Sequence, residues 1–329
     1  MRNIFIYDYG TVVSTLQNRV LVKKENWVIE DVPIETLESI NIFSKAQVTT
    51  QCILECAKRG IGIVYYTLAG DYVCELISGS STGVTRQRKQ ALVYDSCFSL
   101  DLGKKVISDK IKNQYALMRR KARDKYVNVS AESEVIQNII FSVERCRCTD
   151  ELIGYEGIAA KTYFSAMEKM VNSKFTFRGR THFPPEDKLN SLLSLGYSLV
   201  TRRIESSIRS RGLNPYFGFI HRDRNNHPSL ASDLIEEWRP IIVDSFVFGM
   251  VNRKEITTDL FEEGTFRLNK NGFAIFNQGL NKKLDVKSSY MGEERGNMTF
   301  TQALLLQIDN YVKAIENNDI EYYIPIRIR

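Results

Sequence analysis

The feature that most constrains the fold of this chain is a change of hydrophobic pattern across residues 78–83, which read SGSSTG. Before this run, short segments rich in β-branched and aromatic residues alternate with turn residues, as in β-strands. After it, apolar residues recur three and four positions apart over long stretches, as in amphipathic helices. Small polar residues between two such regions are typical of a linker. The sequence therefore predicts an α+β fold, with a small N-terminal β-sandwich-like domain over residues 1–78, a linker over 79–83 and a larger, mostly α-helical domain over 84–329.

The individual elements follow from the same two patterns. In the N-terminal part we expect strands near residues 4–7, 11–16, 19–22, 27–29, 39–43, 62–66 and 72–77, and one helix near 48–59. In the C-terminal part we expect helices near 84–125, 131–147, 156–172, 188–211, 232–252 and 299–317, and a hairpin around 269–272. The last residues, 322–329, are predicted to be strand-like and to dock on a partner or on the protein itself.

Positive charge is concentrated in one stretch of the chain. The net charge is +6, but residues 84–126 contain twelve Lys or Arg against four Asp, so this stretch carries +8 and the remainder −2. Such a concentration attracts a phosphate backbone, although a short basic run also solvates the outer face of a helix. The candidate DNA-binding residues are Arg119, Arg120, Lys121 and Arg123, with Arg202, Arg203, Arg209 and Arg211 on a later helix.

The six cysteines show no spacing that demands disulfides or completes a zinc site. Cys52 and Cys56 are four apart on the apolar face of a predicted helix, so we expect them in the core. No signal peptide and no apolar run long enough to span a membrane is present in the sequence. We therefore expect a cytoplasmic protein with reduced thiols and no membrane partner.

Three residues far apart in the sequence are candidate ligands of one divalent cation. Glu156 lies between Gly154 and Gly157, where we expect close backbone approach and the first turn of a helix. His221 ends the apolar run 216–220, which predicts a strand or extended segment. Glu236 lies in the helix predicted to follow it. Two carboxylates and an imidazole suit Mg²⁺ or Mn²⁺.

The segment around Glu236 contains a second acidic candidate. Ser229 is a plausible N-cap for this helix, and Asp233 and Glu236 share one helix face because they are three residues apart. Asp233 is therefore expected to be an auxiliary metal ligand or a carboxylate that faces DNA. His227, in the polar loop before the helix, is an alternative to His221. Each residue also has an ordinary structural interpretation, such as an acidic group that stabilises a helix N-terminus.

Four blocks of sequence, in this order, resemble one family. They are GYEGIAAKTYF at 154–164, PPEDKLNSLLSLGYSL at 184–199, GLNPYFGFIH at 212–221 and SLASDLIEEWRP at 229–240. The chain resembles the CRISPR-associated integrase that inserts new spacers into CRISPR arrays, the catalytic subunit of the adaptation complex. It departs from the family pattern at Thr181, His182 and Phe183, which stand where basic residues are usual, and at Asn214, which replaces a common Asp.

The resemblance implies a function and partners. Glu156, His221 and Glu236 would be the catalytic residues and would hold Mg²⁺ or Mn²⁺ for the joining of 3′-hydroxyl ends of a short DNA fragment to a CRISPR repeat by transesterification. With water as the nucleophile, the same site would act as an endonuclease. The family also implies double-stranded and branched DNA as substrates, a homodimer formed through the β domain, and two such dimers bridged by a dimer of a small ferredoxin-like CRISPR partner.

Two other classes of function remain open from the sequence. A catalytically silent DNA-binding scaffold would keep the basic face and use the carboxylates structurally, so it would bind DNA without metal and neither cut nor join it. A metal-dependent hydrolase of a small phosphorylated molecule would work equally well in the presence of competing DNA.

Overall fold

The computed structural model describes residues 2–25, 27–66, 72–76, 83–171, 174–181, 184–225 and 227–327. The chain divides into two compact units, Met1–Thr82 and Gly83–Arg329. The division coincides with the end of the predicted linker, most of which lies outside the described residues. In the part of the chain that the structure describes, no helix is long and apolar enough to cross a membrane. The predicted fold class, a β domain followed by a mostly helical one, is confirmed.

In its described residues, the first unit contains two four-stranded sheets and one α-helix, α1 (Thr50–Lys58). One sheet has the order β1-β5-β7-β8 and the other has the order β4-β3-β2-β6. Their strands are β1 (Arg2–Ile6), β2 (Thr11–Leu16), β3 (Arg19–Lys24), β4 (Trp27–Pro33), β5 (Leu37–Ile42), β6 (Gln47–Val48), β7 (Gly62–Tyr66) and β8 (Tyr72–Leu76). The 3₁₀ turn η1 (Ile34–Thr36) connects β4 to β5.

Strand pairing in this unit mixes two directions. The β2–β3 hairpin is antiparallel and turns at Gln17 and Asn18, both with positive φ, as a tight two-residue turn requires. By contrast, β1, β5 and β7 run parallel. Parallel strands need longer connections than a tight turn. The connection between the parallel strands β5 and β7 contains α1. This parallel pairing was not evident from the alternation of short strands.

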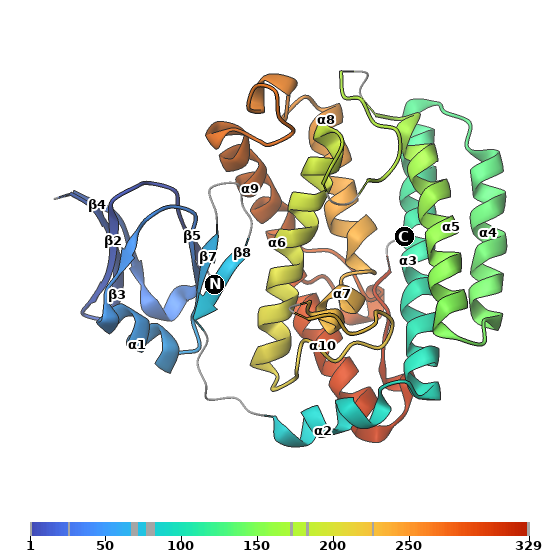
Figure 1. Ribbon diagram of the computed structural model, residues 1–329, viewed down its shortest axis with the longest axis horizontal. Helices are drawn as coiled ribbons and strands as arrows, with labels where there is room; N and C mark the ends of the chain where they lie inside the picture. The colour runs from blue at the N-terminus through green and yellow to red at the C-terminus, as the bar shows by residue number, and fades with distance from the viewer. Residues whose placement is uncertain are drawn as a thin grey trace. The chain divides into compact units, whose positions relative to one another are not determined.

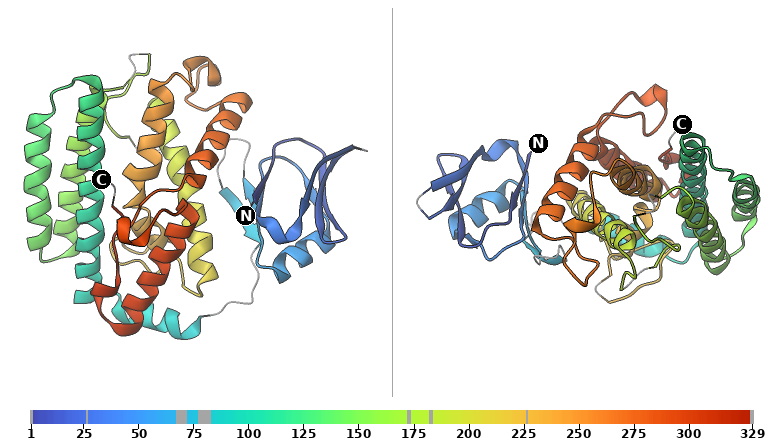
Figure 2. Two further views of the ribbon diagram at one scale, coloured as in Figure 1. Left: turned by 180° about the vertical axis from the view of Figure 1, so that it is seen from behind. Right: turned by 90° about the horizontal axis from the view of Figure 1, so that it is seen from above.

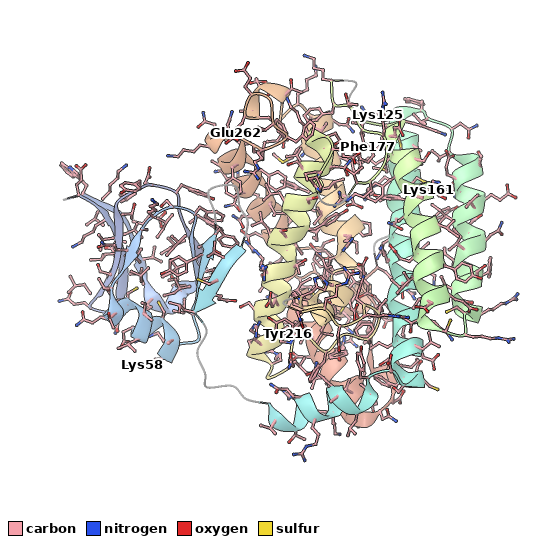
Figure 3. The ribbon with its side chains drawn as sticks, in the orientation of Figure 1. Lys58, Lys125, Lys161, Phe177, Tyr216 and Glu262 are labelled. Carbon is pink, nitrogen blue, oxygen red and sulfur yellow. The ribbon has the colours of Figure 1, made fainter. Side chains whose placement is uncertain are left out.

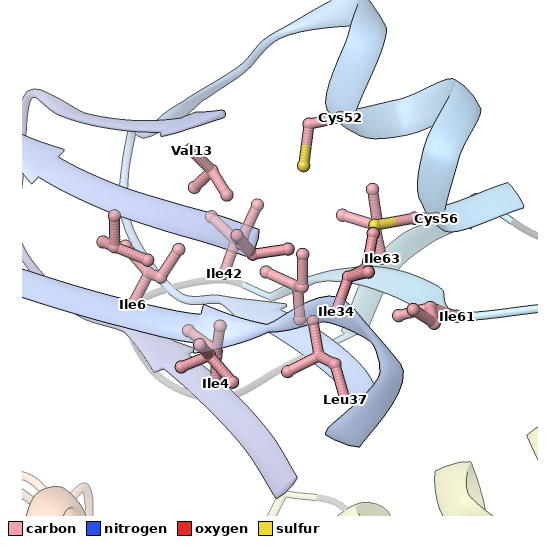
Figure 4. Packing of buried hydrophobic residues seen from close by; sticks show 14 residues of the cluster. Ile4, Ile6, Val13, Ile34, Leu37, Ile42, Cys52, Cys56, Ile61 and Ile63 are labelled. Atoms are coloured by element: carbon pink, nitrogen blue, oxygen red, sulfur yellow. The ribbon is translucent and has the colours of Figure 1, made fainter. Parts of the chain in front are cut away.

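The core of the first unit is made of aliphatic side chains from both sheets and from α1. Figure 4 shows Ile63 beside the sulfur atom of Cys56, and Ile4, Ile42 and Cys52 in the same cluster. Both cysteines are fully buried and free, so the prediction that they belong to the core is confirmed. Burial of branched aliphatic side chains contributes roughly 1.5–3 kcal/mol each, which favours this packing.

The second unit is helical (Figure 1). Its helices are α2 (Val84–Val93), α3 (Cys97–Lys125), α4 (Ser130–Arg145), α5 (Thr149–Glu168), α6 (Lys188–Ser210), α7 (Ser229–Leu234), the π-helical turn η2 (Arg239–Asp244), α8 (Ser245–Asn252), α9 (Lys270–Asp285) and α10 (Phe300–Asn317), with 3₁₀ turns η3 (Thr258–Leu260), η4 (Glu293–Arg295) and η5 (Ile320–Tyr322). Both views in Figure 2 show α3, α4 and α5 side by side.

Several predicted helix boundaries were wrong for local reasons. The helix expected over 84–125 is two helices, because Asp95 adopts positive φ and Ser96 then caps α3 through the N–H of Ser99. The hairpin expected at 269–272 is instead the start of α9, where the Asn269 side chain accepts from the N–H of Gly272. An Asn that caps a helix and an Asn in a tight turn look alike in sequence.

Residues 323–327 pack within the second unit and do not form a strand, while residues 328 and 329 of the predicted segment lie outside the described part of the chain. Tyr323 and Ile326 are fully buried. The Asn113 side chain on α3 donates to the Ile326 carbonyl at 2.7 Å, and Arg327 pairs with Asp109 on the same helix. Residues 320–327 therefore pack against the buried polar side of α3.

Candidate active site

The helical unit contains a cavity of about 720 Å³ lined by residues from distant parts of the sequence. Glu156 from α5, His221 from the loop before α7 and Glu236 from the segment after α7 all line it. In Figure 3, Lys161 marks the α5 wall of the cavity. The fold therefore brings the three residues singled out in the sequence to one place.

The sequence predicted Glu156 in the first turn of a helix. In the structure it lies near the second turn of α5. The helix begins at Thr149, and Asp150 and Glu151 supply the acidic groups that favour a helix N-terminus. Gly154 and Gly157 are therefore inside the helix, and a Cβ added at either would meet open space. The expected close backbone approach at these glycines is wrong.

The residue that joins the two candidate carboxylates is Lys110 of α3. Its Nζ forms an ion pair with Glu156 Oε1 and lies 2.5 Å from Glu236 Oε2. The Lys110 side chain is only 3% exposed. Burial disfavours the ammonium, but the charges of Glu156 and Glu236 outweigh it and raise the Lys110 pKa. The lysine is therefore a charged group held between two acids.

His221 is oriented by Asp233. The Asp233 carboxylate accepts the backbone N–H groups of Phe219 (2.5 Å), Ile220 (3.0 Å) and His221 (3.0 Å), and its Oδ1 lies 2.6 Å from His221 Nδ1. This arrangement folds residues 219–221 into a tight loop, so the strand expected at 216–220 does not form. Burial lowers the His221 pKa, but the hydrogen bond to Asp233 and the negative charges of Asp233 and Glu236 together outweigh it, so the net shift is upward.

Asp233, expected to be an auxiliary metal ligand or a carboxylate that faces DNA, lies in the protein interior. It is completely buried, and both of its oxygens are engaged by the loop and the imidazole. Gly218 packs so closely on it that an added Cβ would lie 2.7 Å from Oδ2. A buried carboxylate with these contacts does not face DNA, and its chemistry is that of a group that orients a histidine ligand. Ser229 is likewise the first residue of α7, and its predicted N-cap position belongs to Pro228.

Glu236 is buried among positive charges. Arg239 lies one helical turn away, with Nη2 3.2 Å from Glu236 Oε1. Burial raises the pKa of the carboxyl, but Arg239, Lys110 and His221 more than offset this and lower it to about 2. The residue is therefore a carboxylate at all physiological pH values, as a metal ligand must be.

A second buried polar group forms another part of the cavity wall. Tyr163 and Tyr197 both donate their hydroxyls to Asp244, the former at 3.0 Å. Burial raises the Asp244 pKa to about 6 despite these hydrogen bonds. The guanidinium groups of Arg239 and Arg180 lie over the Tyr197 ring, 4.8 Å and 5.4 Å from its centroid. Two arginines are thus stacked on one aromatic ring at the cavity.

The donor set suits Mg²⁺ or Mn²⁺, because it combines two carboxylates with one imidazole whose Nδ1 is held by Asp233. Glu236 Oε2 is buried and has an ion-pair contact but no hydrogen bond. As they stand, however, the described residues contain no group of three His, Cys, Asp or Glu side chains that would hold a metal. The Lys110 ammonium contacts both Glu156 and Glu236. An ion that uses both carboxylates must displace it.

The two basic sets differ in how they are engaged. At the end of α3, Arg119, Arg120 and Arg123 are exposed and line a second cavity of about 760 Å³ beside α4. Lys121 is half-buried, and burial with neighbouring Arg120 lowers its pKa. The exposed arginines of this α3 set are accessible to an anion, so their contact with DNA stays a prediction.

The arginines of α6 are instead engaged within the protein. Arg202 and Arg209 both pair with the buried Glu205, each at 2.7 Å. Arg211 pairs with Asp309 at 2.7 Å, and Arg203 donates to Asn281. These contacts give the α6 set a structural role, so its predicted contact with DNA has less support than that of the α3 set.

His227, the alternative to His221, lies outside the cavity. His227 Nε2 lies 3.0 Å from Ser232 Oγ, and the residue does not line the cavity. His182 and Phe183, which depart from the family pattern, lie outside the described residues. The sequence interpretation missed several polar residues at the cavity, among them Lys110, Arg180, Arg239 and Asp244. For Arg239, the signal was its position one turn from Glu236.

Comparisons with known proteins agree on one family. The family model of CRISPR associated protein Cas1 matches residues 4–282. A "CRISPR-associated endonuclease Cas1" from Mycobacterium tuberculosis is 33% identical over 321 residues, which cover 96% of this chain and 94% of the relative. The solved structure of a CAS1 protein from Thermotoga maritima has a TM-score of 0.80 at 21% identity, covering 96% of this chain and 97% of that one.

A chain of a solved Cas6-RT-Cas1–Cas2 complex has a TM-score of 0.82 at 21% identity. The alignment covers 98% of the present chain but only 36% of that longer one. At such identities, the solved structures are evidence for the fold.

Proposed function

The chain belongs to the CRISPR-associated Cas1 family, and on that premise we propose that it is a metal-dependent DNA endonuclease and integrase of CRISPR adaptation. The observation that carries the proposal is that Glu156, His221 and Glu236 line one cavity together with Lys110 and Arg239. Acidic ligands for a cation and basic groups for a phosphate are the two requirements of phosphodiester chemistry.

The polar residues in and beside the cavity would divide the reaction among them. Glu156, His221 and Glu236 would hold Mg²⁺ or Mn²⁺, and the ion would supply Lewis-acid chemistry at the target phosphate. Asp233 keeps Nδ1 of His221 engaged, so that Nε2 is the nitrogen available to a ligand. The stacked guanidinium of Arg239 binds phosphate oxygens.

The nucleophile determines the outcome at this site. A 3′-hydroxyl of a DNA fragment attacks the target phosphorus, a new phosphodiester forms, and the target strand's 3′-oxygen leaves with a proton. Water in place of the hydroxyl gives hydrolysis. In both cases one P–O bond forms as another breaks, and no covalent bond to the protein is needed.

The proposed DNA substrate is double-stranded or branched, and its backbone would extend from the cavity to the exposed α3 set of Arg119, Arg120 and Arg123. Release of counterions from phosphates makes such binding weaken steeply with salt. We further propose a homodimer formed through the first unit, and a small ferredoxin-like CRISPR partner that bridges two dimers. The structural likeness to a chain of the Cas6-RT-Cas1–Cas2 complex, in which that protein is assembled with Cas2, supports the proposal of such a partner.

The test is strand transfer of a labelled short duplex with 3′-hydroxyl ends into supercoiled plasmid, with branched-DNA cleavage measured in parallel. Wild type, Glu156→Gln and His221→Ala are compared in Mn²⁺, Mg²⁺ or EDTA. Because each ligand contributes to holding the ion, we expect both variants to lose nearly all product. Glu144→Gln, an exposed carboxylate on α4, is the control and is expected to retain activity.

Three outcomes separate the proposals. Metal-dependent product that only the ligand variants lose supports the integrase. DNA binding without any product from wild type, with or without metal, points to the silent scaffold. Activity on a small phosphate ester that excess DNA leaves unchanged points to a hydrolase of small molecules.

A further inference from the structure

Lys110 occupies an unusual position for a lysine. It projects from the middle of the long helix α3, is almost completely buried, and contacts both Glu156 and Glu236. These two acids are candidate metal ligands, and they come from separate parts of the chain: Glu156 from α5 and Glu236 from the segment after α7. The ammonium therefore neutralises the same charges that a divalent ion would neutralise.

Lys110 and a metal ion cannot both bind between the two carboxylates. An ammonium held close to Oε1 of Glu156 and to Oε2 of Glu236 occupies the position from which an ion would ligate those oxygens. The two cations would also repel each other strongly at a separation of a few ångströms in a buried site. Binding of a metal through Glu156 and Glu236 must therefore move the Lys110 ammonium.

Among the described residues, the cavity offers the displaced ammonium no other buried carboxylate that is without hydrogen-bond donors. Most of its other charged lining groups are cations, since Lys161, Arg178, Arg180 and Arg239 all face it. Of its remaining acids, Asp244 already accepts from Tyr163 and Tyr197, and Glu168 is exposed at the end of α5. A buried ammonium without a partner is costly. An anionic ligand that enters the cavity would remove this cost.

We propose that Lys110 is an internal cation that competes with the metal for Glu156 and Glu236, so that metal binding is coupled to the arrival of a phosphodiester that receives the displaced ammonium. This inference rests on the proposed function. It makes Lys110 a positioning residue in the free protein and a phosphate contact in the complex. Because coupling between two ligands is reciprocal, the metal also strengthens DNA binding to the same extent.

The experiment measures Mn²⁺ affinity of the full-length protein by electron paramagnetic resonance of free Mn²⁺, with and without a short DNA duplex, after subtraction of Mn²⁺ bound by the duplex alone. Lys110→Met removes the charge and keeps the length of the side chain. Lys110→Arg keeps the charge. Lys112→Met is the matched control, because this lysine lies on the other side of α3 and does not line the cavity.

Without DNA, we expect Lys110→Met to bind Mn²⁺ about tenfold or more tightly than wild type, within the usual range for coupled sites. Addition of DNA is expected to tighten Mn²⁺ binding to wild type and to have a much smaller effect on Lys110→Met. Lys110→Arg and Lys112→Met are expected to resemble wild type. Thermal unfolding in EDTA provides a second measurement, in which Lys110→Met unfolds at a lower temperature and gains more from Mn²⁺ than wild type does.

The possible failures are distinguishable. Equal or weaker Mn²⁺ binding by Lys110→Met, while wild type binds the ion, overturns the role of Lys110 and leaves the metal-dependent enzyme standing. Absence of Mn²⁺ binding by both proteins overturns the metal dependence and the competition together. Should Lys110→Met not fold, Lys110→Gln carries the same expectation, and unchanged affinity in that variant overturns the proposal.

Discussion

At the scale of single residues, Asp233 determines how His221 is presented. Its carboxylate accepts three consecutive backbone N–H groups and contacts the imidazole, so one side chain shapes the loop and orients the ring. Asp233→Asn replaces one accepting oxygen with an N–H₂ donor that faces other donors. We expect roughly 10- to 100-fold weaker Mn²⁺ binding, the usual cost of losing a group that orients a ligand. Calorimetric titration with Mn²⁺ measures it.

Asp223→Asn is the control for this variant, because Asp223 lies two residues after His221 but is exposed. It is expected to bind Mn²⁺ as wild type does. Unchanged affinity in Asp233→Asn would mean that His221 does not need this partner, and the assigned role of Asp233 would be withdrawn.

Asp244 gives the stability of the protein a predictable pH dependence. Burial raises its pKa in the folded state to about 6 from the ordinary value of 3.8, so the folded protein holds this proton more tightly than the unfolded chain does. The stabilisation is complete below about pH 4 and is lost as pH rises through 6. We expect it to amount to at most about 3 kcal/mol.

Chemical denaturation at several pH values tests this effect against Asp244→Asn, which cannot titrate. The unfolding free energy of wild type should fall relative to that of the variant between pH 4 and 6 and run parallel to it above pH 7. Parallel curves throughout that range would show that Asp244 does not hold a proton in the folded protein.

At the scale of elements, the C-terminal segment fixes the relation between α3 and the segment that carries Glu236. Tyr323 donates to Glu237 Oε2 at 2.8 Å and accepts from Gln307 at 2.9 Å, while Asn113 and Asp109 of α3 bind residues 326 and 327. Burial raises the pKa of Glu237 to about 8, a further sign of how enclosed this contact is. Lys110 and Glu236 are the sequence neighbours of Asp109 and Glu237, which this segment contacts.

Tyr323→Phe removes the hydroxyl from this enclosed contact. Because Glu237 and Gln307 each lose one buried hydrogen bond and keep the one between them, we expect the unfolding free energy to fall by about 1–3 kcal/mol. Urea denaturation measures the change. Tyr322→Phe, an exposed neighbour, is expected to alter stability very little. An equal effect of the two substitutions would argue against a specific role for the Tyr323 hydroxyl.

At the scale of the whole molecule, the first unit has the features of an association surface. β4 is an edge strand, and its consecutive residues Trp27, Val28 and Ile29 are exposed, the tryptophan by 78%. Exposed apolar residues on a strand edge are a template for contact with another chain. This observation supports the proposed dimer through the β domain.

Trp27→Glu is therefore expected to convert the dimer to a monomer in size-exclusion chromatography with light scattering. Introducing a charge into an apolar interface disfavours association strongly. Tyr126→Glu is the control, because Tyr126 is an exposed aromatic residue of the helical unit, 99% accessible. A dimer that persists in Trp27→Glu would place the interface elsewhere.

How much was predictable follows from the range of the interactions involved. The helix over 188–211 is observed as Lys188–Ser210 and that over 299–317 as Phe300–Asn317, because apolar periodicity and capping are local. The expected hairpin at 269–272 was wrong because the capping Asn269 also suits a turn. The parallel pairing of β1, β5 and β7 escaped notice because it joins distant segments.

The sequence by itself determined the division into a β part and a helical part and most of the helices. It also identified Glu156, His221 and Glu236 as candidate ligands of a divalent cation. Only the tertiary structure decided what surrounds them. Lys110 meets Glu156 across 46 residues of sequence, and Tyr163 meets Asp244 across 81. A charged residue on a helix is usually solvated. The burial of Lys110 between two acids depends on how α3 and α5 pack, so no local pattern in the sequence predicts it.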